Sequence, residues 1–176
     1  MFNAAAFLTY VFVMTFTPGP NNIMAMTFTN QDGFKKTQKF MLGVACGFFL
    51  LMLLSSYFNL LLYSYLPKIK LVMDIIGAVY MVFLAVKIVW SKPHDGEKRD
   101  TKLNAFIPGV FLQFVNPKGV LYCITVAASF IMPYYRSGII ILLFALFTTA
   151  VVYASNNVWG AFGILFQRFL SKCLSG

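Results

Sequence analysis

Long apolar stretches separated by short polar segments dominate the pattern of the chain. No Asp, Glu, Lys or Arg occurs in residues 1–31, 40–67 or 137–167. Crossing about 30 Å of hydrocarbon takes about 20 helical residues, so each stretch is long enough to span a membrane. With charges and turn residues as boundaries, the pattern predicts five transmembrane helices: Ala4–Thr29, Phe40–Leu66, Leu71–Trp90, Ala105–Met132 and Gly138–Trp159.

Beyond the fifth predicted span the apolar residues recur with the spacing of one helix face, and polar residues take the other face. The apolar positions are Phe162, Leu165, Phe166, Phe169, Leu170, Cys173 and Leu174. This spacing predicts a C-terminal amphipathic helix in the membrane interface. The alternative is a loop that leads to a sixth span. The predicted fold class is therefore an all-α integral membrane protein with five transmembrane helices plus a C-terminal amphipathic helix.

The amino-acid composition narrows the class of protein further. Apolar residues make up 60% of the chain and charged residues 11%, and the mean hydropathy is +0.77. These values exclude a soluble enzyme, a nucleic-acid-binding domain and a disulfide-rich secreted domain. The net charge of +9 is spread between the spans, so it indicates no nucleic-acid partner. Residues 1–31 lack the basic start of a signal peptide, so the first span is expected to be retained.

The basic residues fall unequally on the two sides of the predicted membrane. One side has Lys35, Lys36, Lys39, Lys87, Lys92, Lys98, Arg99, Lys102, Arg168 and Lys172; the other has Lys68, Lys70 and Arg136. Because cytoplasmic loops carry the excess of Lys and Arg, the N-terminus is expected outside and the tail in the cytoplasm. We expect one membrane domain, residues 1–176, with a cytoplasmic loop at 91–104.

Two predicted spans contain helix-breaking residues near their middles. Pro18 and Pro20 flank Gly19 in the first span, and Asn116-Pro117-Lys118 interrupts the fourth. Proline cannot donate a backbone hydrogen bond, so each break leaves carbonyl groups that need other partners. Such breaks persist in a membrane only where protein or a water-lined cavity satisfies them. The simpler interpretation, a packing kink with Lys118 as a structural counter-charge, stays open.

The two spans run in opposite directions, and each break comes at a similar depth. This arrangement favours an inverted repeat of residues 1–90 and 105–176, in which half-helix N-termini face an anionic group and unwound carbonyls face a cation. A zwitterionic amino acid has both charges. The predicted substrate-binding residues are Pro18, Gly19, Pro20, Asn21, Asn22, Gln113, Asn116, Pro117 and Lys118.

Three further polar residues lie within predicted spans. Asp74 is a candidate for ion coupling, although it could instead pair with Lys70 or reach the outer interface. Asn156 and Asn157 either line the transport path or form hydrogen bonds between helices. Gly43 and Gly47 have the spacing of close helix packing. No pattern indicates a metal site or a cofactor.

Several motifs together resemble those of the LysE/RhtB amino-acid exporters. They are Thr17-Pro18-Gly19-Pro20-Asn21-Asn22, Gly33, Gly43, Gly47, Gly77, Tyr80, Leu112 through Lys118, Asn156 through Trp159, and Leu165 through Arg168. The likeness is strongest to the cysteine/O-acetylserine branch. It implies a homodimeric, proton-driven secondary exporter (an antiporter) of small amino acids in the bacterial inner membrane, in contact with lipid.

Two other functions compete with export. Members of the family usually have about six spans, with a further apolar helix after the position of Lys172. A non-transporting or degenerate membrane subunit or scaffold that lacks the last helix is therefore the alternative. A transmembrane thiol carrier would need a nearby cysteine pair, whereas Cys46 and Cys123 lie in different predicted spans.

Overall fold

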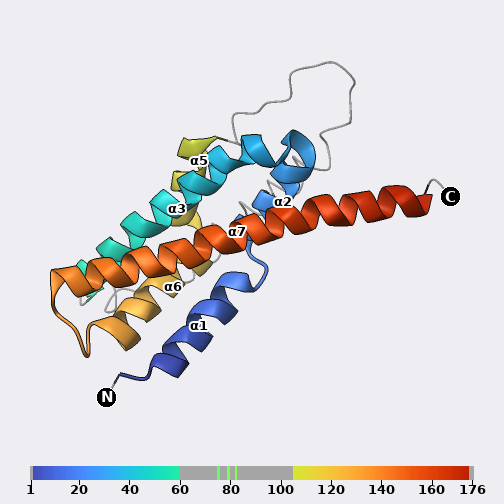
Figure 1. Cartoon of the computed structure of the whole chain (residues 1–176). Helices are drawn as coiled ribbons and strands as arrows, with labels where there is room; N and C mark the ends of the chain where they lie inside the picture. The colour runs from blue at the N-terminus through green and yellow to red at the C-terminus, as the bar shows by residue number, and fades with distance from the viewer. Residues whose placement is uncertain (1, 60–74, 76–78, 80–81, 83–104, 175–176) are drawn as a thin grey trace.

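The protein is described from a computed structural model, which covers residues 2–59, 75, 79, 82 and 105–174, with side chains up to residue 165 in the last helix. The secondary structure elements in this part are all helical, as predicted. They are α1 (Ala4–Phe16), α2 (Pro20–Asp32), α3 (Phe34–Tyr57), α5 (Phe106–Val115), α6 (Pro117–Thr125), the π-helix η1 (Val126–Ile131) and α7 (Gly138–Leu174) (Figure 1).

The described helices include several that suit a membrane. The helix α3 and the part of α7 over Gly138–Leu165 are each long and apolar enough to cross it. The pair Phe106–Val115 and Pro117–Ile131 forms a third span if it is counted as one helix bent by 67°. The region of the first predicted span contains two helices, α1 and α2, of which α1 is apolar but too short to cross the membrane alone. The predicted span Leu71–Trp90 lies outside the described residues apart from three isolated positions.

The C-terminal region differs from the sequence-based expectation in one respect. The tail is helical, but it continues α7 without a break instead of forming a separate helix after Trp159 (Figure 1). The helix continues because two glycines after Trp159, Gly160 and Gly163, pack against α2 instead of ending it. A Cβ atom at Gly160 would lie 2.8 Å from Thr29 Oγ1, and one at Gly163 would lie 3.0 Å from Asn30 Oδ1. Both glycines therefore permit close approach of α7 to α2.

The helices α3 and α5 pack in direct backbone contact. A Cβ atom at Gly43 would lie 2.0 Å from the carbonyl oxygen of Phe106, and one at Gly47 would lie 2.6 Å from that of Val110. Gly109 on α5 is equally close to the backbone of α3. Small residues at helix interfaces allow this approach in membranes. The packing role predicted for Gly43 and Gly47 is thus confirmed.

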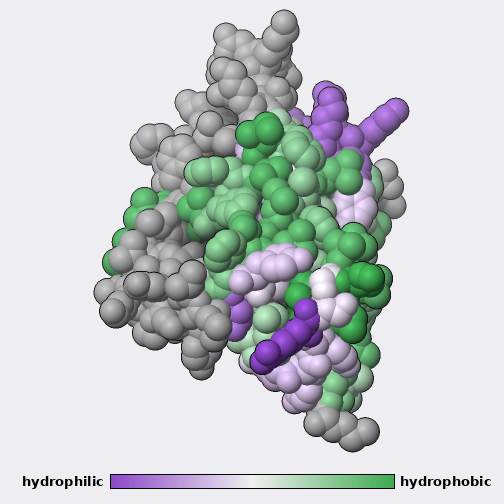
Figure 2. Space-filling model, turned by 90° about the vertical axis from the view of Figure 1, so that its left-hand side faces the viewer, coloured by the Kyte–Doolittle hydropathy of each residue, from purple (hydrophilic) through white to green (hydrophobic). Residues whose placement is uncertain are grey.

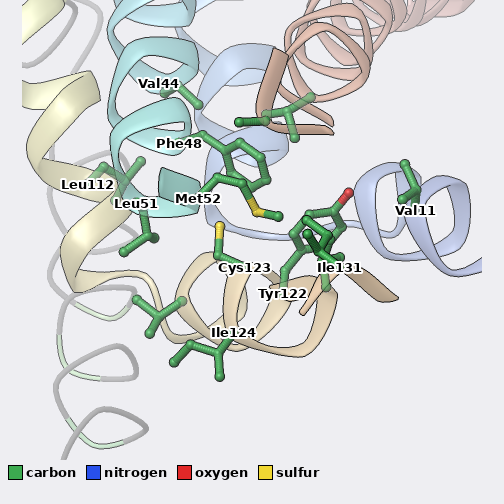
Figure 3. Close-up of a cluster of buried hydrophobic side chains, with 14 of the residues drawn as sticks. Val11, Val44, Phe48, Leu51, Met52, Leu112, Tyr122, Cys123, Ile124 and Ile131 are labelled. Atoms are coloured by element: carbon green, nitrogen blue, oxygen red, sulfur yellow. The ribbon is translucent and has the colours of Figure 1, made fainter. Parts of the chain in front are cut away.

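The apolar core lies where α3, α5, α6 and α1 converge (Figure 3). Its labelled members are Val11, Val44, Phe48, Leu51, Met52, Leu112, Tyr122, Cys123, Ile124 and Ile131. Figure 2 shows a broad hydrophobic band on the outer surface, with hydrophilic residues toward both ends. Large apolar side chains such as Ile107 and Ile139 are more than 70% exposed. A surface of this kind is suited to contact with lipid chains.

Candidate functional site

The first helix break lies between Phe16 and Pro20, and side chains from α2 and α7 satisfy its carbonyls. Trp159 Nε1 donates to the Phe16 carbonyl at 3.2 Å. The carbonyl of Thr15 accepts from Asn22 Nδ2 at 3.0 Å and from Ser155 Oγ at 3.1 Å. Side-chain donors therefore replace backbone donors where the helix is interrupted.

The second helix break lies at Asn116, between α5 and α6. The Asn116 side chain caps α6 by accepting the backbone N–H of Lys118 at 3.1 Å. Pro117 occupies the first position of α6, where a helix needs no N–H donor. The residue types at the break thus explain both why α5 ends and why α6 starts again in a new direction.

The two breaks meet each other across a distance of about ninety residues in sequence. Asn116 Nδ2 donates to Asn21 Oδ1 at 3.1 Å, and Asn21 Nδ2 donates to Gln113 Oε1 at 3.3 Å. Lys118 Nζ donates to the carbonyl of Thr17 at 2.5 Å. The aliphatic part of Lys118 also lies against Gly19, where a Cβ atom would be 2.9 Å from Lys118 Cδ.

A cavity lies beside this junction, with room for the centres of water molecules over about 40 Å³. This is enough for more than one water molecule. The lining residues come from α1, α2, α3, α6, α7 and the two breaks: Met14, Thr15, Gly19, Pro20, Asn21, Asn22, Phe48, Asn116, Lys118, Gly119, Tyr122, Val152 and Asn156.

Six of the predicted substrate-binding residues line this cavity. They are Gly19, Pro20, Asn21, Asn22, Asn116 and Lys118. Gln113 is fully buried and reaches the cavity only through its hydrogen bond to Asn21. Pro18 and Pro117 belong to the breaks but are not among the lining residues. Asp74 lies outside the described residues.

The two candidate path residues on α7 have different surroundings. Asn156 is fully buried and lines the cavity. Asn157 instead accepts a hydrogen bond from Gln38 Nε2 at 2.7 Å and donates to the Tyr153 carbonyl at 2.8 Å. The Tyr153 hydroxyl donates to Gln38 Oε1 at 2.6 Å, so these three residues connect α3 to α7. Asn156 therefore lines a cavity, whereas Asn157 forms the hydrogen bonds between helices that were one of its two expected roles.

Thr15 and Tyr122 are lining residues that sequence reasoning did not single out. Tyr122 follows Lys118 by four residues, which places both on one face of α6. That spacing could have indicated Tyr122. Thr15 stands two residues before the first proline motif, and nothing in its local sequence distinguishes it from the neighbouring threonine.

The charge distribution at the cavity favours an anion near Lys118. This residue is half-buried, it lies in the first turn of α6, which begins at Pro117, and it contacts Gly19, which precedes the start of α2 at Pro20. Helix N-termini carry partial positive charge and free N–H groups. No acidic residue is among those that line the cavity in the described part of the chain. A carboxylate is the substrate group that this region suits.

Comparison with known proteins identifies the family of the chain. Residues 12–173 match the LysE type translocator family. The chain belongs to this family. Membership confirms the resemblance in the sequence motifs and identifies a membrane transporter, not an enzyme. No solved structure gives a significant match to the chain.

Three similar relatives carry the name cysteine/O-acetylserine efflux protein. The protein from Klebsiella pneumoniae is 34% identical over 93% of this chain and 83% of its own length. The Salmonella typhi protein is 36% identical, covering 93% and 84%, and the Escherichia coli O157:H7 protein is 33% identical, covering 96% and 86%. The similarity therefore extends over most of each protein.

Proposed function

We propose that the protein is a secondary exporter of small amino acids or their derivatives, of the cysteine and O-acetylserine type, in the bacterial inner membrane. Family membership and the names of the relatives support the class of transport. The observation that carries the proposal is the junction of the two helix breaks beside a polar cavity. Lys118 and Asn116 from one break contact Thr17 and Asn21 of the other there.

In this proposal Lys118 binds the substrate carboxylate. Its ammonium group is held by the neutral carbonyl of Thr17 in the structure. A carboxylate adds Coulomb attraction between opposite charges to the hydrogen bond, which the neutral carbonyl lacks, so an arriving carboxylate can displace that carbonyl. The N–H groups at the start of α2 and α6 add further positive potential. Release of Thr17 would then loosen the junction between the breaks when substrate binds.

The polar side chains at the junction divide into two groups in this mechanism. Asn21, Asn22, Gln113 and Asn116 hold the breaks in place, because each already donates or accepts a hydrogen bond within the protein. Of the predicted binding residues, Lys118 is the one whose partner a substrate can replace most favourably. The broken helices are thus the frame of the site, and Lys118 is its anion-binding group.

The rest of the proposal combines the sequence pattern, which gives the inverted halves, the orientation and Asp74, with the family resemblance, which implies proton antiport and a homodimer. Residues 1–90 and 105–176 form inverted halves joined by the cytoplasmic loop 91–104, with the N-terminus outside. Proton antiport drives export, with Asp74 as the coupling carboxylate. The functional unit is a homodimer surrounded by lipid. Inverted halves explain why one break occurs in each half at a similar depth.

The test is efflux of radiolabelled cysteine and O-acetylserine from proteoliposomes, with and without a pH gradient. We expect wild-type protein to export both, faster with the gradient, and Lys118→Ala to lower the rate at least tenfold. Lys39→Ala is the matched control, because Lys39 is exposed on α3 and does not line the cavity. If the Lys118→Ala variant exports at the wild-type rate, the role of Lys118 in carboxylate binding is refuted. If the wild-type protein exports neither compound, the proposed transport function is refuted.

A further inference from the structure

The residues that line the cavity include an asparagine with no hydrogen-bond partner. Asn156 is fully buried in α7, and neither its Nδ2 nor its Oδ1 atom makes a hydrogen bond in the structure. The cavity-lining amides of Asn21, Asn22 and Asn116, by contrast, are all hydrogen-bonded within the protein. Leaving a buried polar group unpaired costs about 1–3 kcal/mol, so an unpaired amide beside a cavity needs an explanation, and a ligand in the cavity is one.

Two hydroxyl groups at the same cavity are in a similar state. Thr15 is 7% exposed and Tyr122 is 3% exposed. The two side chains are close enough to interact, and in Figure 3 the Tyr122 oxygen points toward α1, the helix that contains Thr15. Neither hydroxyl makes a hydrogen bond of good geometry. Three neutral side chains that line one cavity, from α1, α6 and α7, thus have oxygen atoms without well-formed hydrogen bonds.

This arrangement complements Lys118 in the same space. A zwitterionic amino acid needs acceptors for its ammonium group, placed away from the cation that holds its carboxylate. The carbonyls of Thr15, Phe16 and Thr17 at the first break already accept hydrogen bonds from protein side chains. The oxygens of Thr15, Tyr122 and Asn156 are neutral, lack well-formed partners and belong to lining residues, so they are the acceptors that the cavity lining offers to an ammonium group.

We propose that Asn156, Tyr122 and Thr15 form the subsite for the substrate's ammonium group. The proposal rests on the proposed function, and it extends that function to the other charge of the substrate. Asn156 Oδ1 and the two hydroxyl oxygens accept from the ammonium, while Asn156 Nδ2 is free to donate to an oxygen of the same substrate. The site therefore selects amino acids over carboxylates of the same shape that lack the amino group.

The experiment compares two ligands that differ in the amino group. Purified full-length protein is titrated with cysteine and with 3-mercaptopropionate, which keeps the thiol and carboxylate but has no ammonium. We expect the wild type to prefer cysteine. Asn156→Leu and Tyr122→Phe should each lower that preference about tenfold or more, the loss expected for one hydrogen bond to a charged group. Lys118→Ala should weaken the binding of both ligands and leave the preference for cysteine unchanged.

Thr149→Val is the matched control, because Thr149 is also on α7 with a buried unpaired hydroxyl but does not line the cavity. This variant should keep the wild-type preference. The proposal is overturned if Asn156→Leu and Tyr122→Phe keep the wild-type ratio of the two dissociation constants, whether or not both ligands bind more weakly. Unfolding is checked by the thermal midpoint without ligand, which should not fall, because isosteric removal of an unpaired polar group is close to neutral.

A failure of this inference can be told apart from a failure of the proposed function. If wild-type protein binds both ligands equally, the ammonium subsite is refuted even where efflux of cysteine is observed. If it prefers cysteine but moves no amino acid in proteoliposomes, the subsite stands and the export function is refuted.

Discussion

At the scale of single residues, buried asparagines have two opposite roles around one cavity. Asn22 donates to the carbonyls of Thr15 and Thr17 and closes the first break. Asn156 is equally buried and makes no hydrogen bond. In our proposal the first residue contributes to stability, and the second binds the ammonium group of the substrate. Residue type and burial are the same, so the partners alone distinguish the two roles.

A pair of matched substitutions tests this difference. Asn22→Leu should lower the free energy of unfolding by about 1–3 kcal/mol, because two carbonyls at the break each lose a donor. Asn156→Leu should leave stability unchanged or slightly raised in the absence of ligand. Thermal or detergent-induced unfolding of both purified variants gives the comparison. An equal loss of stability in the two variants would show that Asn156 has a structural role.

The sequence revealed the breaks but not this division of roles. Prolines and glycine mark the interruption directly, because they remove donors and relax the backbone. The donors that satisfy the first break, Ser155 and Trp159, lie about 140 residues further along the chain. No local pattern connects them to the break. Only the folded structure shows which amides are already paired and which are free.

At the scale of the helices, the site depends on how closely α5 approaches α3. The bent pair α5 and α6 carries Gln113, Asn116 and Lys118, and glycine contacts set its position against α3. The spacing of Gly43 and Gly47 predicted this packing. The continuity of α7 was not predicted, because the polar face that begins near Gln167 was interpreted as a separate interfacial helix.

A methyl group in this interface should disturb the site at a distance. Gly43→Ala places a Cβ atom 2.0 Å from the Phe106 carbonyl oxygen, so the two helices must separate. We expect a loss of about 1–3 kcal/mol in stability and weaker binding of cysteine. Gly138→Ala is the control, because its Cβ would contact only Tyr57 Oη, at 3.7 Å. Equal stability and binding in both variants would contradict this account of the packing.

At the scale of the whole molecule, the chain joins an apolar exterior to a polar junction in its interior. Ile107, Ile139 and other large apolar side chains lie on the outside, whereas Asn116 and Asn156 are buried. Hydropathy alone predicted the all-helical membrane fold, because a membrane leaves few other structures possible. It could not show that the two breaks touch, since that contact depends on how helices distant in sequence are arranged.

The two helix breaks meet in the structure, and we propose that the substrate path runs beside this junction. The most direct measurement is cross-linking between two introduced cysteines, Asn21→Cys and Asn116→Cys. The protein used lacks Cys46, Cys123 and Cys173. The reagent is a short thiol-specific cross-linker that reduction cleaves. We expect an intramolecular cross-link that forms more slowly when O-acetylserine is present. Absence of the cross-link, or a rate of formation that O-acetylserine does not change, would contradict this arrangement.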